Sequence, residues 1–175
     1  MKKFLVLAIA LLSTLPVSAT EYLRSCYDDN SDYLQTLVNI NQAEWTITYT
    51  AFEDRSCETP YLHYEVKYQT QQSANNIDMM ATEVSYTALS ELVGEVLNQI
   101  NYCGFNNWKA FEKKVVTGKV CDEFQTPKAN EVLYSIFELK NNGTELFLGM
   151  PSGNFSGKTP ERRHQSLDPL GFTLQ

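Results

Sequence analysis

The stretch that decides the fold is Trp45-Thr46-Ile47-Thr48-Tyr49-Thr50-Ala51, in which apolar and aromatic residues alternate with threonines. Alternation with a period of two puts successive side chains on opposite faces of a β-strand, and β-branched and aromatic residues favour that conformation. Residues 62–68 alternate in the same way, and residues 80–86 continue the pattern more weakly. These runs predict consecutive antiparallel strands that share one apolar face.

One segment breaks this pattern. Apolar residues from Ala88 to Ile100 recur at spacings of three and four, the period of an amphipathic helix. Thr87 is a suitable N-cap, Glu91 lies near the positive end of the helix dipole, and Gly104 follows as a C-terminal glycine. We therefore predict a single helix over residues 87–102.

Strands are expected again over residues 108–120, 131–139, 144–150 and 171–174, with a hairpin turn at Asn141-Asn142-Gly143. The chain thus reads as mainly β, with about eight or nine short antiparallel strands and one helix. Exposed strand edges invite unwanted pairing, and closing the sheet removes them. We predict a closed or nearly closed meander barrel, with a two-sheet sandwich as the alternative.

Residues 1–19 have the order of a secretory signal peptide: a basic start, an apolar run over 4–12 and a small-residue exit ending at Ala19. The apolar run is too short to span a bilayer, so we expect no integral membrane protein. Residues 20–175 then form a single domain. We expect the mature protein in the periplasm, or secreted.

The net charge of the chain after the leader disfavours some classes of binding partner. The leader holds two of the 14 basic residues, which leaves 12 against 21 acidic ones and a net charge of −9. A chain this acidic, without a basic tract, is not expected to bind nucleic acid or an anionic membrane surface.

Four cysteines follow the leader, and an even number in an exported chain indicates disulfides. Four cysteines allow three pairings. Their spacing does not match a zinc site, because no Cys-x-x-Cys is present.

Catalytic and cofactor motifs are weak throughout the chain. There is no Gly-x-Ser-x-Gly, and the two histidines, His63 and His164, are interpreted as solvated residues. Residues 153–159 miss the glycine spacing of a phosphate loop, and residues 28–32 lack the glycine of a calcium loop and are read as a surface turn. We predict a protein without a cofactor, metal site or enzymatic activity.

Aromatic side chains are the most informative candidates for a site. Five of them are predicted to lie on one side of consecutive strands and to line a common interior: Trp45, Tyr49, Tyr64, Tyr68 and Tyr86. A buried tyrosine needs a partner for its hydroxyl, so such rings suit a partly wet cavity that holds a small ligand. Plain core packing is the alternative interpretation.

Two groups of short motifs resemble a known family. Ser25-Cys26, Trp45 and Phe52-x-Asp54-x-x-Cys57-x-x-Pro60 resemble the extracellular domain of the adenomatosis-polyposis-coli-down-regulated proteins and small bacterial exported proteins of similar pattern. Cys103-Gly104-x-x-x-Trp108, the segment 116–121 and the segment 163–168 are similar to those bacterial proteins. The resemblance implies a lipocalin-like (calycin-like) antiparallel barrel with an internal cavity, although the Gly-x-Trp of true lipocalins is absent.

We predict the disulfides Cys26–Cys57 and Cys103–Cys121. The first would tie the opening strand to the far end of the strand that starts at Trp45. The second would close the segment that follows the helix, where Gly104 and Gly118 permit tight turns.

Two functions are compatible with these features. The first is a barrel that binds a small apolar or amphipathic ligand. The second is a protein-interaction module, such as an envelope accessory protein or a hydrolase inhibitor. A hollow interior favours the first, and exposed apolar or charged loops around a filled barrel favour the second.

Overall fold

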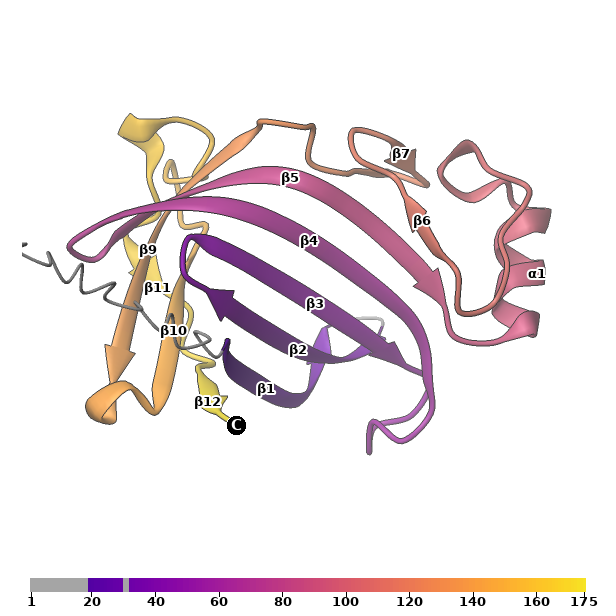
Figure 1. Ribbon diagram of the computed structural model, residues 1–175, viewed down its shortest axis with the longest axis horizontal. Helices are drawn as coiled ribbons and strands as arrows, with labels where there is room; N and C mark the ends of the chain where they lie inside the picture. The colour runs from indigo at the N-terminus through magenta and orange to yellow at the C-terminus, as the bar shows by residue number, and fades with distance from the viewer. Residues whose placement is uncertain (1–18, 30–31) are drawn as a thin grey trace, which may run out of the picture.

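The chain folds into a closed antiparallel β-barrel, as the computed structural model shows for residues 19–29 and 32–175 (Figure 1). The predicted signal peptide, apart from Ala19, lies outside the described residues. Each strand pairs with the next, and the last returns to the first. In ring order they are β1 (Thr20–Asp29), β2 (Asp32–Asn41), β3 (Glu44–Phe52), β4 (Pro60–Ser73), β5 (Asn76–Ala88), β9 (Val132–Lys140), β10 (Glu145–Met150) and β12 (Phe172–Leu174). This ring confirms the predicted lipocalin-like barrel and excludes the sandwich.

Strand β5 divides its pairing between two neighbours. Its first half pairs with β9, from Asn76 opposite Ile136 to Met80 opposite Val132. Its second half pairs with the short β6 (Lys113–Val115). The intervening segment, residues 89–131, also holds α1 (Glu91–Gln99), η1 (Tyr102–Gly104), β7 (Val120–Cys121) and β8 (Phe124–Gln125), and it gathers at the barrel end where β5 finishes (Figure 1). Outside the ring lie η2 (Asn141–Gly143), η3 (Pro160–Arg162) and β11 (Ser166–Leu167), which pairs with β10.

The pairing register stacks the inward side chains of β2 to β5 in four layers. Nearest the end covered by the 89–131 segment is the rim layer, made of Leu34, Ala51, Leu62 and Ala88. Next comes the tyrosine layer, made of Thr36, Tyr49, Tyr64 and Tyr86. The waist follows, made of Val38, Ile47, Val66 and Val84, each no more than 6% exposed. The tryptophan layer lies beyond it, made of Ile40, Trp45, Tyr68 and Ala81. The aliphatic waist therefore separates the two ends of the barrel.

The helix is shorter than the predicted range 87–102. It begins after Ser90, whose side chain accepts a hydrogen bond from the Val93 amide at 3.2 Å. Thr87 is not the N-cap, because it belongs to β5 and pairs with both His63 and Lys113. The helix ends at Gln99, and the left-handed residue that follows it is Asn101 rather than Gly104.

The predicted long strand over residues 108–120 is wrong, because only short pieces of it pair. The side chain of Asn98 occupies both backbone groups of Trp108: it accepts from the amide at 2.6 Å and donates to the carbonyl at 3.0 Å. Gly118, with φ +71°, turns the chain back before β7. An irregular segment therefore replaces the strand.

Both predicted disulfides form. Cys26 is joined to Cys57, which ties β1 to the loop between β3 and β4. Cys103 is joined to Cys121, which ties η1 to β7 within the 89–131 segment. Two disulfides indicate an oxidising compartment.

Arg24 fastens the end of the chain to β1. Its guanidinium forms an ion pair with Asp168 at 2.8 Å, donates to the carbonyl of Leu170 and lies 4.2 Å from the ring centroid of Phe172. The side chain is nearly buried, at 11% exposure, so these contacts are shielded from water. They hold β12 where it pairs with both β1 and β10.

His164 is buried rather than solvated, with 3% exposure. Its Nδ1 lies 3.0 Å from the hydroxyl of Ser135, and its Nε2 is buried without a hydrogen-bond partner. Gly149 and Gly157 leave room for this side chain, since an added Cβ would come within 2.8 Å of the His164 Cβ at Gly149 and within 2.7 Å of Nε2 at Gly157. Burial lowers the pKa of His164, so the folded state favours the neutral ring.

This burial predicts a loss of stability in acid. Because the pKa of His164 is lowered on folding, protons bind the unfolded chain first as the pH falls below about 6.5. The free energy of unfolding of the wild type should therefore fall relative to that of His164→Gln between about pH 7 and pH 5. Urea unfolding of both proteins across this range measures the difference. A difference that stays constant with pH would contradict the assignment.

Candidate functional site

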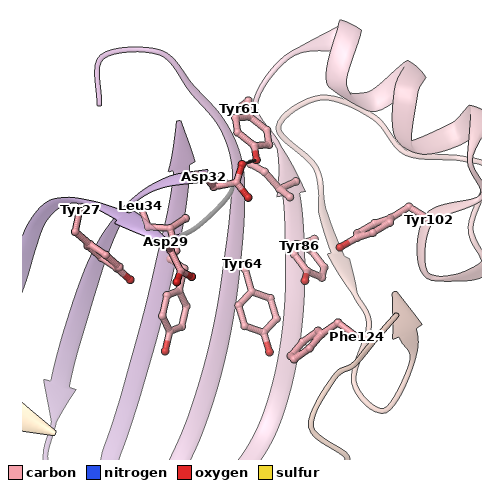
Figure 2. Close-up of a pocket in the computed structure, with 12 residues that line it drawn as sticks. Tyr27, Asp29, Asp32, Leu34, Tyr61, Tyr64, Tyr86, Tyr102 and Phe124 are labelled. Carbon is pink, nitrogen blue, oxygen red and sulfur yellow. Dashed lines mark hydrogen bonds between the residues drawn. The ribbon is translucent and has the colours of Figure 1, made fainter. Parts of the chain in front are cut away.

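A pocket of about 460 Å³ opens at the barrel end that faces the 89–131 segment (Figure 2). Seven of its twelve lining residues are aromatic, three are aliphatic, and two are aspartates at the mouth. We call it the tyrosine pocket; it is lined by Tyr27, Asp29, Asp32, Leu34, Tyr49, Ala51, Tyr61, Leu62, Tyr64, Tyr86, Tyr102 and Phe124. The waist lies directly beneath the tyrosine layer, on the far side of it from the pocket mouth.

The structure divides the five aromatic residues predicted to share one interior. Tyr49, Tyr64 and Tyr86 lie in the tyrosine layer and line the tyrosine pocket. Trp45 lies on the other side of the waist, buried to 1% exposure, and Tyr68 lies beside it. Tyr68 packs against both apolar clusters of the barrel and lines neither end.

Tyr64 is the centre of the aromatic wall. Its ring centroid lies 5.8 Å from that of Tyr49, 4.8 Å from that of Tyr86 and 6.0 Å from that of Phe124. Tyr102 extends the wall from the 89–131 segment, with its ring 5.4 Å from Tyr86 (Figure 2). The wall is therefore a continuous aromatic surface built from the barrel and from the segment that covers its end.

The mouth is bounded by polar groups. The hydroxyl of Tyr61 donates to the carboxylate of Asp32 at 2.5 Å, which links the starts of β4 and β2 (Figure 2). Asp29 lies at the end of β1 beside the same opening. Deeper in the pocket, the hydroxyls of Tyr27 and Thr36 lie 3.0 Å apart.

Burial keeps the pocket hydroxyls protonated. Desolvation raises the pKa of Tyr49 to about 12, and it raises the pKa values of Tyr64 and Tyr86 as well. Desolvation also raises the pKa of Tyr61, and the bond to Asp32 adds to this effect. At neutral pH the tyrosines are therefore uncharged donors and acceptors, and the aspartates are the charged groups of the pocket.

Each disulfide lies beside residues of the pocket. Cys26 precedes Tyr27, and its partner lies in the loop that leads to Tyr61. Cys103 follows Tyr102, and its partner Cys121 pairs with Phe124 in the β7–β8 hairpin. The two bonds thus brace opposite walls.

A second, smaller pocket of about 190 Å³ lies at the far end of the barrel. Trp45 lines it, with its ring edge-on to Phe137 at 6.0 Å, and its indole Nε1 is buried without a hydrogen-bond partner. The waist separates this pocket from the tyrosine pocket, so Trp45 does not contact a ligand held among the tyrosines.

Several lining residues escaped the sequence analysis. Tyr61 and Leu62 both face the pocket although they are consecutive, because the β3–β4 register shifts at the start of β4. Tyr27 follows a similar irregularity in β1, and strict alternation hides such positions. Tyr102 lies in η1 and Phe124 in the two-residue strand β8, elements too short to show a periodic pattern, and the nearby cysteines are the sequence signal.

Among residues 19–29 and 32–175, no group of three or more histidine, cysteine, aspartate or glutamate side chains is placed to hold a metal ion. In the same part of the chain, no helix is both long and apolar enough to cross a membrane. Ser135 and His164 are within hydrogen-bond distance, but both are buried and neither lines the tyrosine pocket.

The fold and the pocket define a closed antiparallel barrel with an aromatic chamber at one end. No protein-family model matches the sequence, and no curated protein matches it.

Removal of the disulfide Cys103–Cys121 should loosen the segment that it closes. Cys103→Ser with Cys121→Ser should lower the free energy of unfolding by about 3 kcal/mol, because the unfolded chain regains conformational freedom. Limited proteolysis should then cut within residues 89–131, which the bond holds in place. The matched control is Cys26→Ser with Cys57→Ser, which should leave that segment protected. Equal protection in both variants would contradict this role.

Proposed function

We propose that this protein is a non-enzymatic binding protein that holds a small amphipathic ligand in the tyrosine pocket. The observation that carries the proposal is the pocket itself, about 460 Å³ of space above a packed waist. This volume is within the usual range of small-molecule sites, about 300–1,000 Å³.

The chemistry of the walls supports an amphipathic occupant. Aromatic rings and the side chains of Leu34, Ala51 and Leu62 offer apolar contact, and uncharged tyrosine hydroxyls offer a few hydrogen bonds. A ligand with an apolar body and one polar end would satisfy both kinds of surface. The braced walls support binding too, since a preformed pocket loses less entropy when the ligand enters.

We also propose that the protein acts in the periplasm or outside the cell, after removal of the signal peptide, and that it is related to the adenomatosis-polyposis-coli-down-regulated extracellular domain. The two disulfides and the closed barrel support these proposals. Intact-mass measurement of exported protein that begins at Thr20 would test the first of them.

A separate observation favours the second candidate, a protein-interaction module. Leu92, Val96 and Ile100 form a row along α1 and are 68%, 46% and 61% exposed. Residues spaced by four lie on the same face of a helix, so the row is a continuous apolar stripe. The stripe uses three side chains of one element, whereas the pocket joins five strands and the 89–131 segment, and we therefore place ligand binding first.

Tyr64→Ala tests the binding function. Removing the central ring should lower the affinity for a ligand in the pocket by about tenfold or more, because the ring contacts three other rings of the wall. Trp108 is the suitable reporter, since its ring lies 6.0 Å from Tyr102. The chain has two tryptophans, so the substitution Trp45→Phe leaves Trp108 as the single one. Its emission can then be followed while the protein is titrated with fatty acids, quinones, alkyl alcohols and alkylammonium ions.

The matched control is Tyr134→Ala, which removes a tyrosine that lies outside the pocket and contacts Arg163. This control should bind as the wild type does. If calorimetry finds no binding from the whole panel, or if both tyrosine variants bind with unchanged affinity, the proposal fails.

A further inference from the structure

The charge of the tyrosine pocket is one-sided. Among the described residues that line it, Asp29 and Asp32 are negative and none is lysine, arginine or histidine. Asp32 is half-buried and accepts a hydrogen bond from the hydroxyl of Tyr61, and Asp29 is exposed at the end of β1, so both carboxylates lie toward solvent (Figure 2). An entering molecule therefore meets negative charge before it meets the rings.

Arg24 lies beside the pocket, 5.4 Å from the ring centroid of Tyr27, but an acidic partner matches its charge. Arg24 pairs with Asp168 at 2.8 Å, donates to the carbonyl of Leu170 and lies against the ring of Phe172. Its positive charge is thus matched by a carboxylate that does not line the pocket. Asp29 and Asp32 are the charged side chains among the residues that line the pocket.

The aromatic wall also favours a positively charged ligand. A tyrosine ring presents a negative face, and a cation within about 6 Å of the ring centroid is attracted to it. Tyr64 and Tyr86 have ring centroids 4.8 Å apart, and Tyr102 adds a third ring 5.4 Å from Tyr86. Several ring faces close together, beside carboxylates, are the features that recognise ammonium ligands.

We propose that the ligand of the tyrosine pocket is an organic cation, an amine or quaternary ammonium with an apolar body, whose charged end is held between Asp29, Asp32 and the tyrosine rings. This inference rests on the proposed function, because it names the chemical class of the ligand in the same pocket. The apolar body would lie against Leu34, Ala51 and Leu62. Anionic amphipaths are disfavoured by both aspartates.

The test uses three probes with one hydrocarbon chain and different heads: octyltrimethylammonium, octanol and octanoate. Calorimetry with the purified oxidised protein at neutral pH should find octyltrimethylammonium bound about tenfold or more tighter than octanoate, with octanol between them. Added salt should weaken the ammonium probe more than octanol, because salt screens charges near the surface.

Substitutions test whether the two aspartates cause the preference for the ammonium probe. The double variant Asp29→Asn with Asp32→Asn should lose most of the preference in affinity for the ammonium probe. Its affinity for octanol should stay the same, which also shows that the pocket is still folded. The control is Glu44→Gln with Glu138→Gln, which changes the net charge equally at strand positions outside the pocket. This control should keep the advantage.

The outcomes separate the two proposals. Equal or tighter binding of octanol or octanoate overturns the cation inference and leaves the binding function standing. An ammonium preference that survives Asp29→Asn with Asp32→Asn also overturns the inference, because the aspartates would not be its source. No binding of any of the three probes overturns the binding function and, with it, the inference.

Discussion

The register of β2 to β5 is the constraint on which the rest of the structure depends. Val38, Ile47, Val66 and Val84 lie side by side across four strands, and together they fill the barrel at one level. A shift of one residue in any pair would turn the inward side chains of that strand outward. The aligned row therefore fixes both the solid centre of the barrel and the open space above it.

The tyrosine pocket follows from this arrangement. Tyrosines stand one layer above the waist and line the pocket with their rings. The barrel supplies five strands of the wall, and the 89–131 segment supplies Tyr102 and Phe124. Because each side of this wall is tied by a disulfide, the chamber is part of the rigid structure of the molecule.

Period-two alternation was sufficient to predict β3, β4 and β5 and their inward face, but not the height of each side chain in the barrel. Trp45 and Tyr49 share a face, yet four residues of strand separate them by about 13 Å. That distance spans the waist, so one residue belongs to each end of the barrel. The height depends on which residues pair across strands, and periodicity within one strand does not carry that information.

The limits of the helix and of the 89–131 segment depend on tertiary contacts for a similar reason. Thr87 has the chemistry of an N-cap, but pairing with two neighbouring strands keeps it in β5, and Ser90 caps the helix instead. Trp108 has the composition of a strand residue, but the side chain of Asn98 takes both its backbone groups. In each case a partner distant in sequence outweighs a local preference.

The closure of the ring by β1 and β12 has a consequence for the order of folding. Tyr22 pairs with Leu174, so the second edge of β1 stays uncovered until β12 joins it. Until then, β1 and β10 both present open edges, and Arg24 has neither Asp168 nor Phe172 to bind. The β2–β5 meander can form early, because its hairpins are local, whereas the ring closes only when β1 meets β12, which is far from it in the sequence. The closing contact therefore has the largest loop to close.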